Sequence, residues 1–159
     1  MSFWLTLPEA AVERMAEPRA SVIDALRGLG RALETVSTLA LMCDPRDIGQ
    51  TLGDGGSGSD GAPPGRDPFS GRTGGFDPTV FLFDALPGGV GLAPRIYERA
   101  EELLGRARLL IDACDCDTGC PACVGPTEEH GSRKRLAKKL FAALALRTET
   151  PAAPRAAGY

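Results

Sequence analysis

The chain has 159 residues, of which 43% are hydrophobic and 25% are charged, and its net charge is -3 at pH 7. This length suits one domain with a real core, and the mildly acidic balance excludes a basic nucleic-acid-binding surface over the whole chain, although not a local basic patch. No apolar run reaches the roughly 18 residues of a membrane span, and the opening "MSFWLTLPEA" lacks the features of a secretory signal, so we expect a cytoplasmic protein with reduced thiols and no membrane partner.

The first third of the sequence predicts a short strand followed by two helices. Residues 3–8, "FWLTLP", alternate bulky and polar side chains, as a strand does. A capping-box spacing then predicts a helix that begins at Leu7 or Pro8 and ends by Pro18. A second helix begins near Ser21, because apolar residues recur there at helical spacing. That stripe is most simply core, with a groove for a partner helix as the alternative; it contains Val22, Leu26, Leu29, Leu33, Val36 and Ala40.

A glycine-rich stretch follows. Residues 49–75 carry ten glycines and few apolar side chains, a composition typical of flexible chain. Because the segments on either side are too small to fold alone, we interpret the stretch as a flexible loop inside one domain, with a functional lid as the alternative. The domain would then span residues 1–146, and residues 147–159 would form a disordered tail.

The second half predicts a strand, a tight glycine turn and two helices. Residues 79–85, "TVFLFDA", are β-branched and aromatic and predict a buried strand, and "LPGGVGLAP" (86–94) predicts a turn. One helix runs from Pro94 to about residue 112, and a last helix spans about 132–146. The turn lacks the lysine of a P-loop and the third glycine of a dinucleotide fingerprint, so it predicts no nucleotide site.

Four of the five cysteines fall within the segment "ACDCDTGCPACVG" (113–125). Disulfides need an oxidising compartment, and the sequence shows no export signal. A redox pair at Cys120 and Cys123 would leave two neighbouring cysteines unexplained. A Cys-x-Cys hook and a Cys-x-x-Cys hook can turn four thiolates toward one ion, and a complete Cys₄ shell leaves no open position for substrate. The segment therefore favours one structural zinc, with an iron–sulfur cluster and the redox pair as alternatives. The predicted ligands are Cys114, Cys116, Cys120 and Cys123.

Two residues near this chemistry have simpler interpretations. Cys43 stands apart from the cluster, and we interpret it as a small buried hydrophobic residue. His130 is the only histidine and could replace a ligand, but four cysteines already complete a zinc shell, so we expect an exposed loop residue.

The last predicted helix begins with a basic cluster that holds all three lysines of the chain. Cations at a helix N-terminus oppose the macrodipole, so the cluster is not arranged for helix stability. It could offset the negative charge of a zinc tetrathiolate, contact the phosphates of nucleic acid, or form a solvated polar face. Its members are Arg133, Lys134, Arg135, Lys138 and Lys139.

Together these elements predict an α+β fold with several helices around a small sheet. Residues 3–7 and 79–84 would form that sheet. A compact Cys₄ zinc knuckle would join the last two helices, and zinc binding would supply folding free energy because the knuckle has almost no core of its own.

The segments "FLFDALPGGVGLAPRIYERAEELL" and "CDCDTGCPACVG", with a final helix, resemble the zinc-binding C-terminal domain of DEAD/DEAH-box helicases of the mitomycin repair factor A type. "MCDPRDIG" and "FWLTLPEA" fit the same domain, so the resemblance covers most of residues 3–146. It implies a superfamily 2 DNA-repair helicase with ATP-driven 3′-to-5′ unwinding, and one zinc bound by the four clustered cysteines.

The sequence also departs from that family, because it has no Walker A motif and no DEAH-type box. We therefore expect an accessory zinc-binding domain without ATPase activity of its own. Its expected partners are helicase motor domains in trans, and DNA could bind at the basic final helix. The alternatives are a small thiol–disulfide redox protein using Cys120 and Cys123, and a protein-interaction module without DNA contact.

Overall fold

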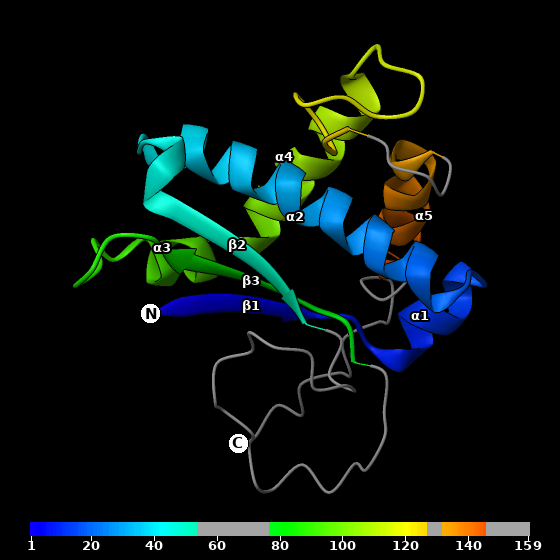
Figure 1. Ribbon diagram of the computed structural model, residues 1–159, viewed down its shortest axis with the longest axis horizontal. Helices are drawn as coiled ribbons and strands as arrows, with labels where there is room; N and C mark the ends of the chain where they lie inside the picture. The colour runs from blue at the N-terminus through cyan, green and yellow to red at the C-terminus, as the bar shows by residue number, and fades with distance from the viewer. Residues whose placement is uncertain (54–76, 127–131, 146–159) are drawn as a thin grey trace, which may run out of the picture.

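The computed structural model describes residues 1–53, 77–126 and 132–145, which form five helices and three strands (Figure 1). The strands are β1 (Ser2–Thr6), β2 (Ile48–Gly53) and β3 (Thr79–Asp84), and a single 3-10 turn (Pro45–Asp47) precedes β2. The helices are α1 (Glu9–Met15), α2 (Arg19–Leu41), α3 (Leu92–Glu98), α4 (Ala100–Ala113) and α5 (Arg133–Ala145). None of the helices in these residues is long and apolar enough to cross a membrane.

The sheet is antiparallel and has the order β1-β3-β2, so β3 is its central strand. Side chains alternate between its two faces. Phe3 and Leu82, which are register partners, are buried on the face that packs on the helices, whereas Trp4 lies on the other face and is 64% exposed. The sheet therefore has one face in the core and, as far as the described residues show, a second face that is exposed at Trp4.

α2 is the central helix of the molecule and packs against the sheet, α4 and α5. Its predicted apolar stripe is core, which confirms the simpler interpretation: Leu26, Leu29 and Leu33 are fully buried. Leu103 of α4 and Leu136 of α5 are fully buried in the same cluster. One continuous hydrophobic core thus joins the sheet to the helices.

Two glycines of α2 let other segments approach it closely from opposite sides. A Cβ at Gly30 would lie 2.3 Å from Gln50 Nε2, so the close approach of the sheet requires glycine there. Gly28 lies two residues away and hence on the opposite face of the helix. A Cβ at Gly28 would lie 3.1 Å from Arg133 Cγ and 3.2 Å from Val124 Cβ. α2 therefore separates the sheet from the cysteine segment, as Figure 1 shows.

The structure corrects two predictions of local structure. Residues 49–53, predicted as the start of a flexible loop, belong to strand β2, because pairing with β3 outweighs their low intrinsic strand propensity. The predicted helix from Pro94 to about residue 112 is two helices, α3 and α4, which meet at Arg99. The rest of the predicted loop, the predicted tail and His130 lie outside the described residues.

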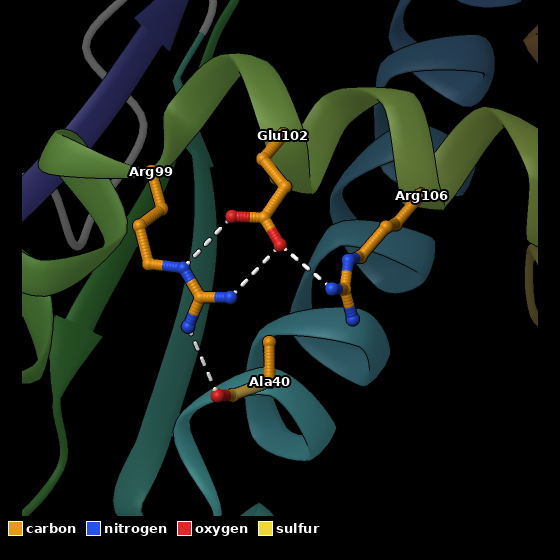
Figure 2. Close-up of polar contacts among 4 residues, drawn as sticks. All are labelled: Ala40, Arg99, Glu102 and Arg106. Atoms are coloured by element: carbon orange, nitrogen blue, oxygen red, sulfur yellow. Dashed lines mark hydrogen bonds and ion pairs between the residues drawn. The ribbon is translucent and has the colours of Figure 1, made fainter.

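Arg99 holds this break in place through its side chain (Figure 2). Its guanidinium donates two hydrogen bonds to Glu102, at 2.9 and 2.8 Å, and one at 3.0 Å to the carbonyl oxygen of Ala40 in the last turn of α2. Arg106 forms a second ion pair with Glu102 at 2.7 Å. The network anchors the start of α4 to a carbonyl of the last turn of α2 that lacks an intrahelical partner.

Candidate metal centre

The four predicted ligand residues converge on one point between α4 and α5. Their sulfur atoms all lie within 4.8 Å of one another, and among the described residues they form the one group of three or more potential ligands. Cys123 is buried, and Cys114, Cys116 and Cys120 are partly buried. The structure therefore brings together all four cysteines that the sequence singled out.

Local backbone geometry produces the two hooks. α4 ends at Ala113, and Cys114 leaves it in an extended conformation. Gly119 bends the chain between the hooks with a φ of 141°, a value that favours glycine. The second hook is a tight turn in which the amides of Cys123 and Gly125 both donate to the carbonyl oxygen of Cys120. Gly125 has a φ of 83°, so glycine also closes the motif.

The sulfur positions fit a tetrahedral zinc shell. Three sulfur pairs are separated by 3.5 Å (Cys114–Cys120), 3.4 Å (Cys116–Cys123) and 3.6 Å (Cys120–Cys123). A zinc ion with four thiolates at about 2.3 Å would place them about 3.8 Å apart. A disulfide needs about 2.05 Å, and all the cysteines in the described residues are free. The residues present therefore fit a four-thiolate metal ion better than a bonded redox pair.

The pKa values of two thiols in the cluster are shifted in opposite directions. Burial, together with hydrogen bonds from neighbouring thiols, raises the pKa of Cys116 to about 12. The hydrogen bond with Cys114 lowers the pKa of Cys120 to about 7. Four thiolates this close repel one another, so complete ionisation of the cluster requires a bound cation.

A buried ion pair connects the start of α5 to α2 and to the cysteine segment. Arg133 is 4% exposed, and its Nε donates to Asp24 Oδ1 at 2.9 Å. Its Nη2 lies 2.8 Å from the same oxygen as an ion pair without hydrogen-bond geometry, and Nη1 donates to the carbonyl oxygen of Val124 at 3.4 Å. Asp24, on α2, is 7% exposed. This arginine is therefore part of the interior.

Lys134 is also buried, with 6% of its surface exposed. Its Nζ donates to the carbonyl oxygens of Cys114 and Cys116, and its backbone amide donates to the carbonyl oxygen of Thr118. The side chain thus holds the first hook, while the backbone holds the turn between the hooks.

The other three basic side chains reach the surface. Arg135 and Lys139 both pair with Glu17, at 3.2 and 2.8 Å, and hydrogen bonds from Lys139 and then Arg135 lower the pKa of that carboxyl. Lys138 is exposed and has no ion pair within the described part of the chain. Of the five residues predicted to contact DNA, these three reach the surface. The contact itself stays a prediction.

Cys43 lies outside the cluster. It is partly buried and packs against the hydrophobic core, and burial raises the pKa of its thiol. It agrees with the predicted role as a small apolar residue, except that its burial is incomplete.

Sequence reasoning offered the basic cluster as an offset for the charge of a zinc tetrathiolate, but it missed that Arg133 and Lys134 are buried and that Arg133 pairs with Asp24. One signal was visible: cations at the start of α5 oppose its dipole, which calls for a local compensating charge. Nothing in the sequence pattern could show that Asp24, which lies 109 residues before Arg133, supplies part of that compensating charge.

A second surface feature is an apolar groove between β1 and α3. It has a volume of about 570 Å³ and is lined by residues 1–4, Ala93, Pro94, Tyr97 and Glu98. Trp4 and Tyr97 are 64% and 75% exposed. Glu98 is the one charged side chain among its lining residues, so the groove is uncharged over most of its area.

Known proteins are similar to parts of this chain. The chain is 43% identical over 58 residues to the ATP-dependent helicase YprA of Bacillus subtilis (strain 168). This match covers 36% of the chain and 8% of YprA. It is 41% identical over 49 residues to protein MJ1572.1 of Methanocaldococcus jannaschii, covering 31% of this chain and 44% of that protein.

A crystal structure of the DUF1998 helicase MrfA bound to DNA matches the fold with a TM-score of 0.63 and 26% identity. The match covers 80% of this chain and 15% of MrfA, so the chain corresponds to a small part of that helicase.

The family model described as the MrfA Zn-binding domain matches residues 29–124, which include β2, β3, the glycine turn and all four clustered cysteines. Zinc is the metal of this family, in agreement with the four clustered thiols and in preference to an iron–sulfur cluster. The match spans more than half of the chain, and we conclude that the chain belongs to the MrfA Zn-binding domain (MZB) family.

Proposed function

We propose that Cys114, Cys116, Cys120 and Cys123 bind one structural zinc, and that the chain acts as a non-catalytic accessory domain of an MrfA-type DNA-repair helicase. The observation that carries this proposal is the convergence of four sulfurs within 4.8 Å. Four thiolates complete the zinc shell and leave no position for substrate, so the metal has a structural role. The ion would join the end of α4 to the start of α5.

Metal analysis tests the zinc assignment. The purified chain should contain one zinc, and Cys123→Ser should lose it, because Cys123 is a buried member of the cluster. Cys43→Ser is the matched control and should keep the zinc, since Cys43 lies outside the cluster. A metal-free native fold with a reducible Cys120–Cys123 disulfide would support the redox alternative instead.

The groove between β1 and α3 supports docking to a helicase motor. Exposed aromatic side chains with almost no neighbouring charge favour a protein partner over a phosphate backbone, which binds cations. The relatives YprA and MrfA are helicases of which the matched region is a small part, so a motor is the partner that the comparisons favour.

Binding to a motor tests this step. The probe is the motor region of an MrfA-type helicase from which its own zinc-binding domain has been deleted. Trp4→Ala and Tyr97→Ala should weaken the association, because exposed aromatics at the centre of an interface contribute most of its binding energy. Leu109→Ala is the matched control, since Leu109 is 67% exposed on α4 outside the groove. Equal weakening by all three variants would argue against the groove.

Catalytic activity gives a further test. We expect no ATP hydrolysis by the chain alone. DNA-stimulated hydrolysis by the purified chain, with contaminating helicase excluded, would contradict the accessory role.

Guidance of a DNA strand is the second candidate. Lys138 favours it, because this lysine is exposed beside Arg135 and forms no ion pair with any described residue. Each phosphate contact makes affinity fall as salt rises. The double variant Arg135→Ala, Lys138→Ala should flatten the salt dependence of single-stranded DNA binding. Arg108→Ala, which removes an exposed cation on α4, is the control. An unchanged slope in the double variant would assign these cations to solvent and to Glu17.

A further inference from the structure

Lys134 stands in an environment that is costly for an ammonium group. It is 6% exposed and is the second residue of α5, where the positive end of the helix dipole disfavours a cation. A buried charge needs a partner of opposite charge or a metal site to compensate for lost hydration.

Among the described residues, no carboxylate supplies that compensation. Lys134 forms no ion pair in the described residues, unlike Arg133, which pairs with Asp24, and Lys139, which pairs with Glu17. Asp115 and Asp117 lie in the same segment, but both are exposed. The Nζ contacts are two carbonyl oxygens, which are polar but carry no net charge.

Those two carbonyls belong to Cys114 and Cys116, the two residues of the first hook. One divalent ion held by four thiolates carries a net negative charge. That charge would lie beside the ammonium, separated from it by the two cysteine backbones.

We propose that Lys134 is a positioning residue of the zinc centre, whose ammonium holds the Cys114–Cys116 hook through two carbonyls and balances the negative charge of the zinc tetrathiolate. This inference rests on the proposed zinc ligation. It accounts both for a buried lysine that has no carboxylate partner in the described part of the chain and for a cation at the start of a helix. Partners outside the ligand shell tune metal affinity by orienting the ligands.

Competition with a chromophoric chelator, carried out on the full chain, tests the inference. Lys134→Met keeps the apolar stem but removes the charge and the hydrogen bonds, and should lower zinc affinity by about 10- to 100-fold. Lys138→Met removes the same charge from an exposed position of the same helix and should leave the affinity unchanged. An unchanged affinity in Lys134→Met, or equal losses in both variants, would overturn the proposal.

Lys134→Gln separates charge from hydrogen bonding and provides a second variant if Lys134→Met is insoluble. It retains donors for the two carbonyls, so its loss of affinity should be smaller than that of Lys134→Met but larger than that of Lys138→Met. If Lys134→Gln bound zinc with the same affinity as Lys138→Met, the electrostatic role of Lys134 would be refuted.

Two readouts distinguish positioning from a merely structural contact. The visible spectrum of the cobalt-substituted protein should shift in Lys134→Met and not in Lys138→Met, because the spectrum reports the geometry of the thiolate ligands. Lys134→Met should also destabilise the zinc-loaded chain but not the zinc-free chain, in which the ammonium has no zinc tetrathiolate to balance. Equal destabilisation of both forms would overturn the proposal.

The ligand variant Cys123→Ser separates the two levels of the argument. If it retains zinc, the proposed ligation fails. If it loses zinc while Lys134→Met binds zinc like the unmodified chain, only the role of Lys134 fails.

Discussion

The helix–sheet body and the cysteine segment are stabilised by different physical interactions. In the body, apolar side chains from α2, α4, α5 and the sheet form one core, in which Leu29, Leu33 and Leu82 are fully buried. Between residues 114 and 125, the buried hydrophobic side chains are Cys123 and Val124 alone. Burial of apolar area can order the body but not this segment.

The cysteine segment therefore depends on polar interactions that are worth little in water and much more in the interior. Four thiols meet at one point, Arg133 reaches Asp24, and Lys134 reaches two carbonyls. The segment should therefore respond to changes of metal and charge, while the body should respond to changes of apolar volume.

Zinc removal should have the largest effect and should unfold the cysteine segment while leaving the body folded. A chelator in excess, or Cys123→Ser, should abolish hydrogen-exchange protection in the segment 114–125 and at the start of α5, because structural zinc in small domains contributes about 10–16 kcal/mol. α2 and the sheet should keep their protection. Uniform loss of protection across the chain would show that body and segment are one unit.

Removal of Asp24 should come next. Asp24→Asn leaves the buried Arg133 guanidinium without its counter-charge, which typically costs about 3–5 kcal/mol of unfolding free energy. Denaturant unfolding would measure the loss. Asp112→Asn is the matched control, because Asp112 pairs with Arg108 at the surface and should contribute little. Equal effects of the two substitutions would contradict the interior role of Asp24.

A core truncation should affect the body without affecting the metal. Leu33→Ala removes a fully buried side chain of α2 and should cost about 2–5 kcal/mol of unfolding free energy. Zinc content and zinc affinity of the folded protein should not change. A parallel loss of zinc affinity would mean that the core and the metal centre are coupled through α2.

The exposed network at Arg99 should show the smallest effect. Hydrogen bonding to Arg99 lowers the pKa of Glu102 below its usual value of 4.5. The network therefore stabilises the fold above that value, and the contribution is lost as pH falls through the lowered pKa. Glu102→Gln should lower the melting temperature slightly at pH 7, and the difference from the unmodified chain should vanish at acid pH and shrink at high salt. A difference that persists at acid pH would refute the ion-pair explanation.

The fold could be predicted from sequence where apolar periodicity was strong. The stripe of α2 and the alternation in residues 3–8 identified a helix and a strand. β2 escaped prediction because Gly49 and Gly53 weaken the local signal, and pairing with β3 decides that conformation. The break between α3 and α4 also had no local signal, since the contact of Arg99 with Ala40 spans 59 residues.

The cysteine cluster could be predicted from the sequence alone, because two short hooks can turn four thiols toward one point, and the structure brings those four sulfur atoms within 4.8 Å of one another. Only the tertiary structure decided what the basic cluster does. Lys134 and Lys138 are four residues apart and so lie near the same face of α5, yet Lys134 is buried and Lys138 is exposed. The difference comes from the neighbouring segments: Lys134 reaches the carbonyls of the first hook, and Arg133 reaches Asp24 on α2. Sequence spacing fixes which residues share a helix face, but the segments packed around α5 decide which of them are buried.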